Sequence, residues 1–231
     1  MTKNKKQFFT LVILNKDDLV GFKYVYSLIN KKDFFEVFVV DGDSKDGSVD
    51  YFIKKKIKYK ILKKGGRGAA MRYALQNCKT KFIIFLSSDG EENPNDLKTM
   101  QNLLMKGNDL VIGSRVINIK SHKSFYNRSF IHRLIFLKII TFFVNLFFKG
   151  SLTDSWNGYR GFKTKKLKKI KSLANDHLIE LEQSIKFLKK KFKITEFPTV
   201  EKNRVGGVSK IPIFMTSFLM IILIIKELIK K

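Results

Sequence analysis

Segments that suit β-strands and segments that suit α-helices alternate through the first 115 residues of this chain. The strands are short apolar runs rich in branched residues, and the helices are longer and more polar. The predicted strands cover residues 8–15, 37–44, 57–62, 81–90 and 109–115, and the predicted helices cover 17–30, 46–56, 65–77 and 93–107. This alternation predicts an α/β fold in which a mostly parallel sheet is covered by helices on both faces.

The length of the chain and its single cysteine narrow the class of protein further. A chain of 231 residues holds one large domain, or one domain with an appendage. Cys78 is the one cysteine, so the chain forms no internal disulfide, and three histidines leave few ligands for a zinc site. We therefore expect one domain over residues 1–210, followed by an apolar helix over 211–231.

The charge of the chain points to anionic partners. Lysine and arginine number 46 against 20 acidic residues, which gives a formal net charge of +26. Nucleic acid, an anionic lipid surface and phosphorylated small molecules all fit that charge. A hydrophobic content of 44% excludes a disordered polycation. Most lysines occur in runs that suit solvated faces, whereas the few arginines lie in distinctive motifs and suit phosphate binding.

Two apolar segments in the second half predict contact with a membrane. Residues 129–149 are apolar with interspersed basic residues, and their longest uncharged stretch, 139–148, is too short to span a bilayer. This pattern favours a helix in the membrane interface, with a buried core helix as the alternative. Residues 211–225 carry no charge and predict a membrane-contacting helix or a tilted single span. Between these two apolar segments, residues 177–191 predict a helix and residues 192–200 predict a strand.

Polar side chains follow the predicted strands at the points where the strands end. These residues are Asp41, Asp43, Ser88, Asp89 and Arg115. Ligands of open α/β sheets bind beyond the carboxyl ends of the strands, so we expect these side chains to form a binding site. The segment 41–44 is also compatible with an ordinary turn, because Asp, Gly and Ser are common turn residues.

A glycine-rich segment opens the predicted helix 65–77. The sequence Gly-Gly-Arg-Gly-Ala-Ala over 65–70 places backbone N–H groups and Arg67 at a helix N-terminus, which is an arrangement that binds anions. The segment lacks the Lys-Ser/Thr pair of a phosphate loop and the glycine spacing of a dinucleotide fold.

Asp89 and Glu91 lie two residues apart after the strongly apolar strand 81–90. Carboxylates at that spacing suit Mg²⁺ or Mn²⁺, which bind carboxylates together with substrate phosphates. In the alternative interpretation, Asp89 caps a loop and Glu91 is solvated.

Two further segments combine charged and polar groups. Residues 154–160, Asp-Ser-Trp-Asn-Gly-Tyr-Arg, indicate either a loop or a paired site, because an unpaired arginine in the interior is costly. Residues 204–210, Arg-Val-Gly-Gly-Val-Ser-Lys, form a flexible basic loop that suits phosphate, or else an ordinary exposed loop.

Taken in order, several of these segments resemble family 2 glycosyltransferases, and within them the dolichol- or polyprenyl-phosphate mannose or glucose synthases. The resemblance runs over about residues 8–210. The matching segments are VVDGDSKDGS, GGRGAAMRYAL, FLSSDGEENPNDL, DLVIGSR, DSWNGYRGF and RVGGVSK. It implies the GT-A fold, a Rossmann-like single domain, and the first 210 residues would then be the catalytic domain.

The resemblance also implies an activity. A hexose, mannose or glucose, would pass with inversion from GDP-mannose or UDP-glucose to a polyprenyl or dolichyl phosphate. The enzyme would work at an anionic membrane surface, with its catalytic domain on the cytoplasmic face and without a nucleic-acid partner. Mg²⁺ or Mn²⁺ would be its cofactor.

Roles for single residues follow from the same resemblance. The nucleotide-sugar site would comprise Asn15, Asp17, Asp41, Asp43, Arg67, Ser88, Asp89 and Arg115. The acceptor phosphate would be bound by Arg115, Arg128, Arg204 and Lys210. Asp89 and Glu91 would hold the metal, and Asp154 and Asp89 would be the catalytic carboxylates.

Two positions depart from the family pattern. Ser87 stands where the family's DxD motif has its first Asp, and Gly42 stands for the second Asp of the VVDD segment. The change at Ser87 removes a carboxylate from beside the diphosphate. Two alternatives follow: a glycosyltransferase with a non-lipid glycan acceptor, or a non-catalytic membrane- or polyanion-binding protein on a degenerate transferase fold.

Overall fold

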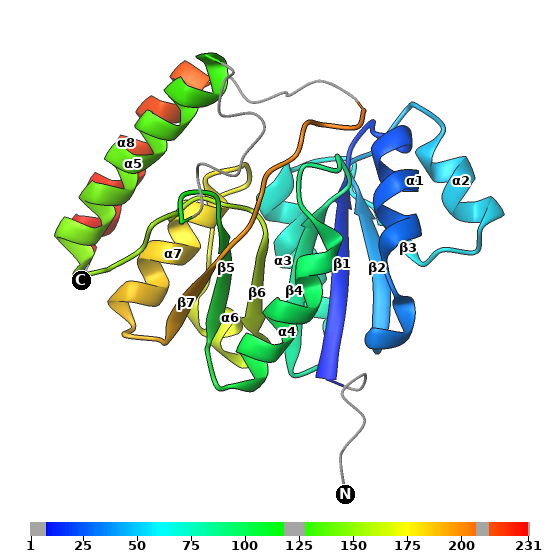
Figure 1. Cartoon of the computed structure of the whole chain (residues 1–231), viewed down its shortest axis with the longest axis horizontal. Coiled ribbons are helices and arrows are strands. Elements are labelled where there is room, and N and C mark those ends of the chain that lie inside the picture. The colour runs from blue at the N-terminus through cyan, green and yellow to red at the C-terminus, as the bar shows by residue number, and fades with distance from the viewer. Residues whose placement is uncertain (1–7, 118–127, 207–212, 231) are drawn as a thin grey trace, which may run out of the picture.

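A seven-stranded sheet forms the centre of the protein in the computed structural model (Figure 1). The structure describes residues 8–117, 128–206 and 213–230, without the side chains of 128–133 and 213–214. The strands are β1 (Phe9–Asn15), β2 (Glu36–Asp41), β3 (Tyr59–Ile61), β4 (Phe82–Ser87), β5 (Leu110–Ser114), β6 (Arg160–Lys163) and β7 (Ile194–Pro198). Their order in the sheet is β3-β2-β1-β4-β6-β5-β7. β6 pairs antiparallel with β4 and β5, and the other neighbours pair in parallel, which confirms the mostly parallel sheet.

Helices cover both faces of this sheet. They are α1 (Leu19–Leu28), η2 (Lys31–Asp33), α2 (Ser48–Lys54), α3 (Arg67–Asn77), η3 (Pro94–Asp96), α4 (Leu97–Met105), α5 (Arg128–Phe148), α6 (Thr164–Ile170), α7 (Ile179–Lys189) and α8 (Ile213–Ile229). Side chains of β1 alternate between the two faces, as they must in a strand. Leu11 and Ile13 pack with α1, α2 and α4, whereas Val12 and Leu14 pack with α3, α6 and α7.

β6 is the strand that the sequence pattern does not predict. Its first residue, Arg160, is completely buried, and its guanidinium donates from Nε to the Asn157 carbonyl at 2.7 Å and from Nη1 to the Glu180 carbonyl at 2.7 Å. Segment 154–160 is therefore a loop that leads into β6, and the buried guanidinium of Arg160 is satisfied by backbone carbonyls. The lysine-rich residues after β6 form α6, whose lysines face outward while Leu167 and Ile170 are buried.

The two predicted apolar helices lie side by side against α7 (Figure 1). Ile140 and Val144 of α5 pack with Met220 and Ile224 of α8 in a small buried cluster of their own. The opposite faces of the two helices are exposed and apolar. The segment 129–149 is thus buried along one side only. None of the helices that the structure describes is both long and apolar enough to cross a membrane.

Candidate active site

Two adjoining cavities lie beyond the carboxyl ends of β1, β2, β4 and β5, where the sequence predicts a binding site. The larger has a volume of about 320 Å³ and lies between the ends of β1 and β2 and the start of α3. The smaller has a volume of about 140 Å³ and lies toward β5. Their shared wall consists of Arg67, Ser87, Asp89, His177 and Arg204.

Two buried oxygen acceptors line the larger cavity without a partner among the described residues. They are Asn15 Oδ1 and Asp18 Oδ2. The amide nitrogen of Asn15 donates to Asp41 Oδ2 at 2.7 Å, and Asp18 caps α1 through Gly21 N at 3.1 Å. Buried acceptors normally have donors, so these two oxygens call for hydrogen-bond donors from a ligand. The sequence reasoning included Asn15 but missed Asp18.

Asp41 and Asp43 are the two predicted nucleotide-binding residues that line neither cavity. Asp41 is completely buried and accepts hydrogen bonds from Asn15, from Ser44 N at 2.7 Å and from Ser44 Oγ at 2.7 Å. Its carboxylate is therefore used to hold the turn after β2. Asp43 turns outward and forms an ion pair with Lys45 at 3.0 Å. Direct contact of both carboxylates with a nucleotide stays a prediction.

Arg67 is fixed at the start of α3 between the two cavities. It forms an ion pair with Glu180, and its Nη1 donates to Ser87 Oγ at 3.1 Å. Gly68, the next residue, lets the start of α3 pack closely against residue 174, because a Cβ on Gly68 would lie 2.1 Å from the Ala174 carbonyl oxygen. The predicted anion-binding start of the helix therefore lines the larger cavity, with Arg67 in its wall.

A carboxyl group that the sequence reasoning missed lies beside Ser87. Glu92 accepts hydrogen bonds from Ser87 N at 2.7 Å and Ser87 Oγ at 3.2 Å. Burial raises the pKa of Glu92 to about 8, against the opposing effect of Arg67. The side chain of Glu92 thus places a carboxyl group beside Ser87, the position at which the sequence pattern lacks an expected Asp. The run of two glutamates after Asp89 was the sequence signal for it.

Asp89 and Glu91 are brought together, as predicted, and both contact Arg204. The Nη2 of Arg204 lies 2.9 Å from Asp89 Oδ2, and its Nε lies 3.5 Å from Glu91 Oε1. Among the residues that the structure describes, no three His, Cys, Asp or Glu side chains are grouped for a metal. Two carboxylates still fit Mg²⁺ or Mn²⁺, because these ions complete their coordination with substrate phosphates and water.

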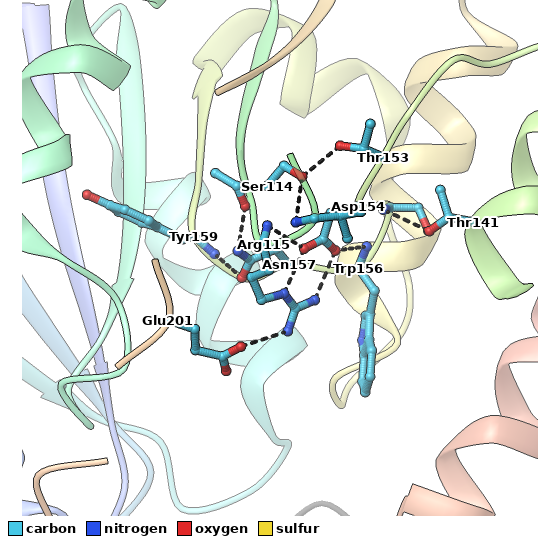
Figure 2. Close-up of polar contacts among 12 residues, drawn as sticks. Ser114, Arg115, Thr141, Thr153, Asp154, Trp156, Asn157, Tyr159 and Glu201 are labelled. Atoms are coloured by element: carbon cyan, nitrogen blue, oxygen red, sulfur yellow. Dashed lines mark hydrogen bonds and ion pairs between the residues drawn. The ribbon is translucent and has the colours of Figure 1, made fainter. Parts of the chain in front are cut away.

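Arg115 lies at the end of β5, where Asp154 holds its guanidinium (Figure 2). Nε and Nη2 of Arg115 donate to the two oxygens of Asp154 at 2.7 and 2.9 Å. Burial opposes ionisation of Asp154, but its bonds to Arg115 outweigh that effect and lower its pKa below the ordinary value.

Asp154 itself is completely buried and lines neither cavity, so it lies behind Arg115. The catalytic role expected for Asp154 stays a prediction. Two more glutamates that the sequence reasoning missed complete this region. Glu196 accepts from the backbone N–H groups of Thr153 and Asp154, both at 2.7 Å, and Glu201 lies 3.8 Å from Arg115 Nη1.

Two predicted phosphate-binding residues lie outside this description. Arg128 opens α5, but its side chain is not among those described, and Lys210 falls in the segment 207–212. The remaining predicted residues, apart from Asp41, Asp43 and Asp154, line one or both cavities.

Similar proteins share this fold and this sequence pattern. A curated relative, glycosyltransferase AglJ of Haloferax volcanii, is 26% identical over 75% of this chain and 56% of its own length. An uncharacterised glycosyltransferase of Rickettsia typhi is 31% identical over 39% of this chain and 30% of its own. The chain thus spans about half or less of the length of these relatives.

Solved structures of glucosyl-3-phosphoglycerate synthase from Mycobacterium tuberculosis superpose on the chain. One, in complex with Mn²⁺, UDP and phosphoglyceric acid, has a TM-score of 0.75 at 14% identity over 96% of this chain and 78% of that one. Another holds Mn²⁺ and UDP-glucose and has a TM-score of 0.74 at 14% identity, over 96% of this chain and 79% of that one. These superpositions confirm the predicted GT-A fold. The model of glycosyl transferase family 2 matches residues 23–171, more than half of the chain. The chain therefore belongs to glycosyl transferase family 2.

Proposed function

We propose that this chain transfers a hexose from a nucleotide sugar to a phosphate group on a polyprenyl or dolichyl lipid at a membrane surface. The single observation that carries the proposal is the pair of cavities that share one polar wall with two arginines and Asp89. A donor in the larger cavity and an acceptor in the smaller one would meet at Arg67, Asp89 and Arg204. Such an arrangement holds two reactants in contact, which accounts for a large part of transferase catalysis.

The larger cavity suits the nucleoside and diphosphate of the donor. Its volume of about 320 Å³ is of the size that small-molecule sites have. The unpartnered oxygens of Asn15 and Asp18 would accept hydrogen bonds from the base or ribose. The backbone N–H groups at Gly66 and Arg67 would bind the diphosphate. Assays with GDP-mannose and with UDP-glucose as donors distinguish the two sugars and the two nucleotides.

Asp89 and Glu91 are the residues that would hold Mg²⁺ or Mn²⁺. When bound there, a divalent cation neutralises charge on the leaving diphosphate. Arg67, held by Glu180 in the wall that the two cavities share, would also neutralise charge on the diphosphate.

The smaller cavity suits an anionic acceptor. Arg115 lines it, and Asp154 holds the guanidinium from behind, so the planar donors are fixed before a phosphate arrives. An acceptor phosphate is already ionised, so its oxygen can attack the anomeric carbon without a general base. The bond to the nucleotide diphosphate breaks on the opposite side, which inverts the configuration. Asp154 acts here as a positioning residue.

The exposed faces of α5 and α8 support a membrane-bound acceptor. Phe142 and Phe218 are each 60% exposed, and Ile229 is 77% exposed. A group of exposed apolar side chains on neighbouring helices marks a site of interaction. The exposed lysines Lys138 and Lys226 on the same helices suit an anionic cytoplasmic leaflet.

A soluble phosphorylated acceptor is the second candidate. One of the two superposed synthase structures contains phosphoglyceric acid, a small phosphate-bearing acid. Arg115 would bind a phosphate of either origin. This version leaves the apolar faces of α5 and α8 without a role in acceptor binding.

Transfer of radiolabel from each nucleotide sugar tests these versions. The chain is incubated with radiolabelled UDP-glucose or GDP-mannose and with polyprenyl phosphate in vesicles or 3-phosphoglycerate in solution. Label in the organic-extractable lipid supports the proposal, and label only in a water-soluble phosphate supports the second candidate. Asp89→Asn should abolish transfer, and Asp33→Asn, an exposed carboxylate on η2, is the control. No transfer from any donor would favour the non-catalytic alternative.

A further inference from the structure

A strap formed by residues 199–206 runs from the end of β7 across the carboxyl ends of the strands toward α1 (Figure 1). Its backbone is attached to the loop that carries the two metal-binding candidates. Lys202 N donates to the Glu91 carbonyl and Val205 N to the Asp89 carbonyl, both at 2.9 Å. The contact is close, because a Cβ on Gly90 would lie 2.5 Å from Val205 Cγ2. The strap therefore packs against the loop 89–91 and is hydrogen-bonded to it.

The strap brings one guanidinium onto two carboxylates. Arg204 contacts both Asp89 and Glu91, and it lines both cavities. Two carboxylates held near one another repel unless a cation lies between them. Arg204 places a cation on both of these carboxylates.

Arg204 is the arginine of the site that is best able to move. Its side chain is 26% exposed and belongs to a loop, whereas the side chains of Arg67 and Arg115 are 13% and 10% exposed. The carboxylates that hold Arg67 and Arg115 are 2% and 0% exposed. A partly exposed ion pair is worth little free energy, and breaking a buried one is costly. Among the three arginines whose side chains the structure describes in the cavity walls, exchange of cations is therefore cheapest at Arg204.

We propose that Arg204 is a displaceable counter-cation of Asp89 and Glu91. It keeps the two carboxylates together in the metal-free protein and leaves them when a divalent cation binds. The inference rests on the donor site of the proposed function.

The displaced guanidinium would remain at the cavity wall. The hydrogen bonds of Lys202 N and Val205 N involve only backbone atoms, so they can persist when the Arg204 side chain swings away. A second positive charge then lies beside the cation, and an anionic ligand phosphate is its natural partner. Binding of the divalent cation would in this way prepare the site for the anion that follows.

Titration with Mn²⁺ in the absence of any nucleotide tests the inference directly. Trp156 is the one tryptophan and lines the smaller cavity together with Asp89 and Glu91, so paramagnetic Mn²⁺ bound there should quench its fluorescence. Arg204→Gln removes the competing cation, and we expect it to bind Mn²⁺ at least about fivefold more tightly than the wild type. Excess Mg²⁺ should reverse the quenching.

Lys202→Gln is the matched control. It removes the same charge from the same strap, and its side chain is exposed and acts electrostatically on Asp96. Its Mn²⁺ affinity should stay close to that of the wild type.

Equal or weaker Mn²⁺ binding by Arg204→Gln would overturn the inference. Equal tightening by both variants would overturn it as well, because net charge alone would then explain the effect. Thermal unfolding of each variant, compared with the wild type, checks that it is folded. No sugar donor is present, so failure of this test differs from failure of the transfer assay.

Discussion

Arg115 and Asp154 form a two-point contact between the end of β5 and the loop before β6, with N–O distances of 2.7 and 2.9 Å. The backbone N–H of Arg115 donates to the same carboxylate at 3.2 Å. The two residues are 39 positions apart in the sequence and come together only because β6 inserts between β4 and β5. The contact therefore fixes Arg115, which lines the smaller cavity, relative to β5 and to the loop before β6.

Removal of the buried carboxylate should destabilise the whole domain. Asp154→Ala leaves the guanidinium of Arg115 without its partner, and loss of one member of a buried ion pair costs about 3–5 kcal/mol of unfolding free energy. Urea denaturation followed by circular dichroism measures this. Asp33→Ala is the control, because Asp33 is exposed on η2 and its loss should cost about 1 kcal/mol or less. Equal losses in both variants would contradict the positioning role of Asp154.

The sheet was largely predictable because its parallel strands are apolar runs bounded by turns. The predicted strands 37–44 and 81–90 extended too far, since β2 ends at Asp41 and β4 at Ser87, where the chain turns into the site. β6 was not predictable, because its four residues include a glycine and two charged residues. Its register depends on contacts of Arg160 with distant parts of the chain.

Site residues next to one another in the sequence were easier to predict than those paired across the fold. The nearness of Asp89 and Glu91 follows from their spacing. By contrast, the partner of Arg67 is Glu180, which lies 113 positions away, and no local pattern links the two. The pairing of Asp154 with Arg115, 39 positions away, could not be predicted for the same reason, because the local sequence does not show whether a loop carboxylate faces a cavity or a buried arginine.

Glu92 should make stability depend on pH. Burial raises its pKa in the folded protein from 4.5 to about 8, so the folded state binds a proton more readily than the unfolded state does. Stability from this group is then greatest below pH 4.5 and is lost as the pH rises toward 8. The unfolding free energy of the wild type, measured in urea with EDTA, should fall relative to that of Glu92→Gln between pH 5 and pH 8.5. A constant difference between the two proteins would show that Glu92 does not titrate in this range.

A methyl group at Gly68 should separate α3 from the loop that follows α6. Its Cβ would lie 2.1 Å from the Ala174 carbonyl oxygen, which is backbone and has little freedom to move. We expect Gly68→Ala to lower the unfolding free energy by about 1–3 kcal/mol. Because Arg67 is adjacent, weaker binding of UDP or GDP should accompany the loss. Gln76→Ala, at an exposed position of the same helix, is the control. If the Gly68→Ala protein is as stable as this control, the loop that contains Ala174 can move aside to make room for the methyl group.

Charges placed on the apolar faces of α5 and α8 should prevent membrane binding without unfolding the protein. Phe142 and Phe218 are each 60% exposed, so Phe142→Glu combined with Phe218→Glu breaks few internal contacts. The carboxylates would have to leave water to enter the interface, and they would meet anionic headgroups of like charge.

Flotation with vesicles that contain anionic lipid measures the binding. The wild type should float with the vesicles, and the double variant should stay at the bottom of the gradient with an unchanged unfolding temperature. Ile53→Glu is the control, because Ile53 is 58% exposed on α2, away from α5 and α8, and its substitution should leave flotation intact. If the double variant floats as the wild type does, the apolar faces are not the membrane-binding surface. High salt should weaken the flotation of the wild type only in part, because screening removes the attraction of the lysines but leaves the burial of the phenylalanines.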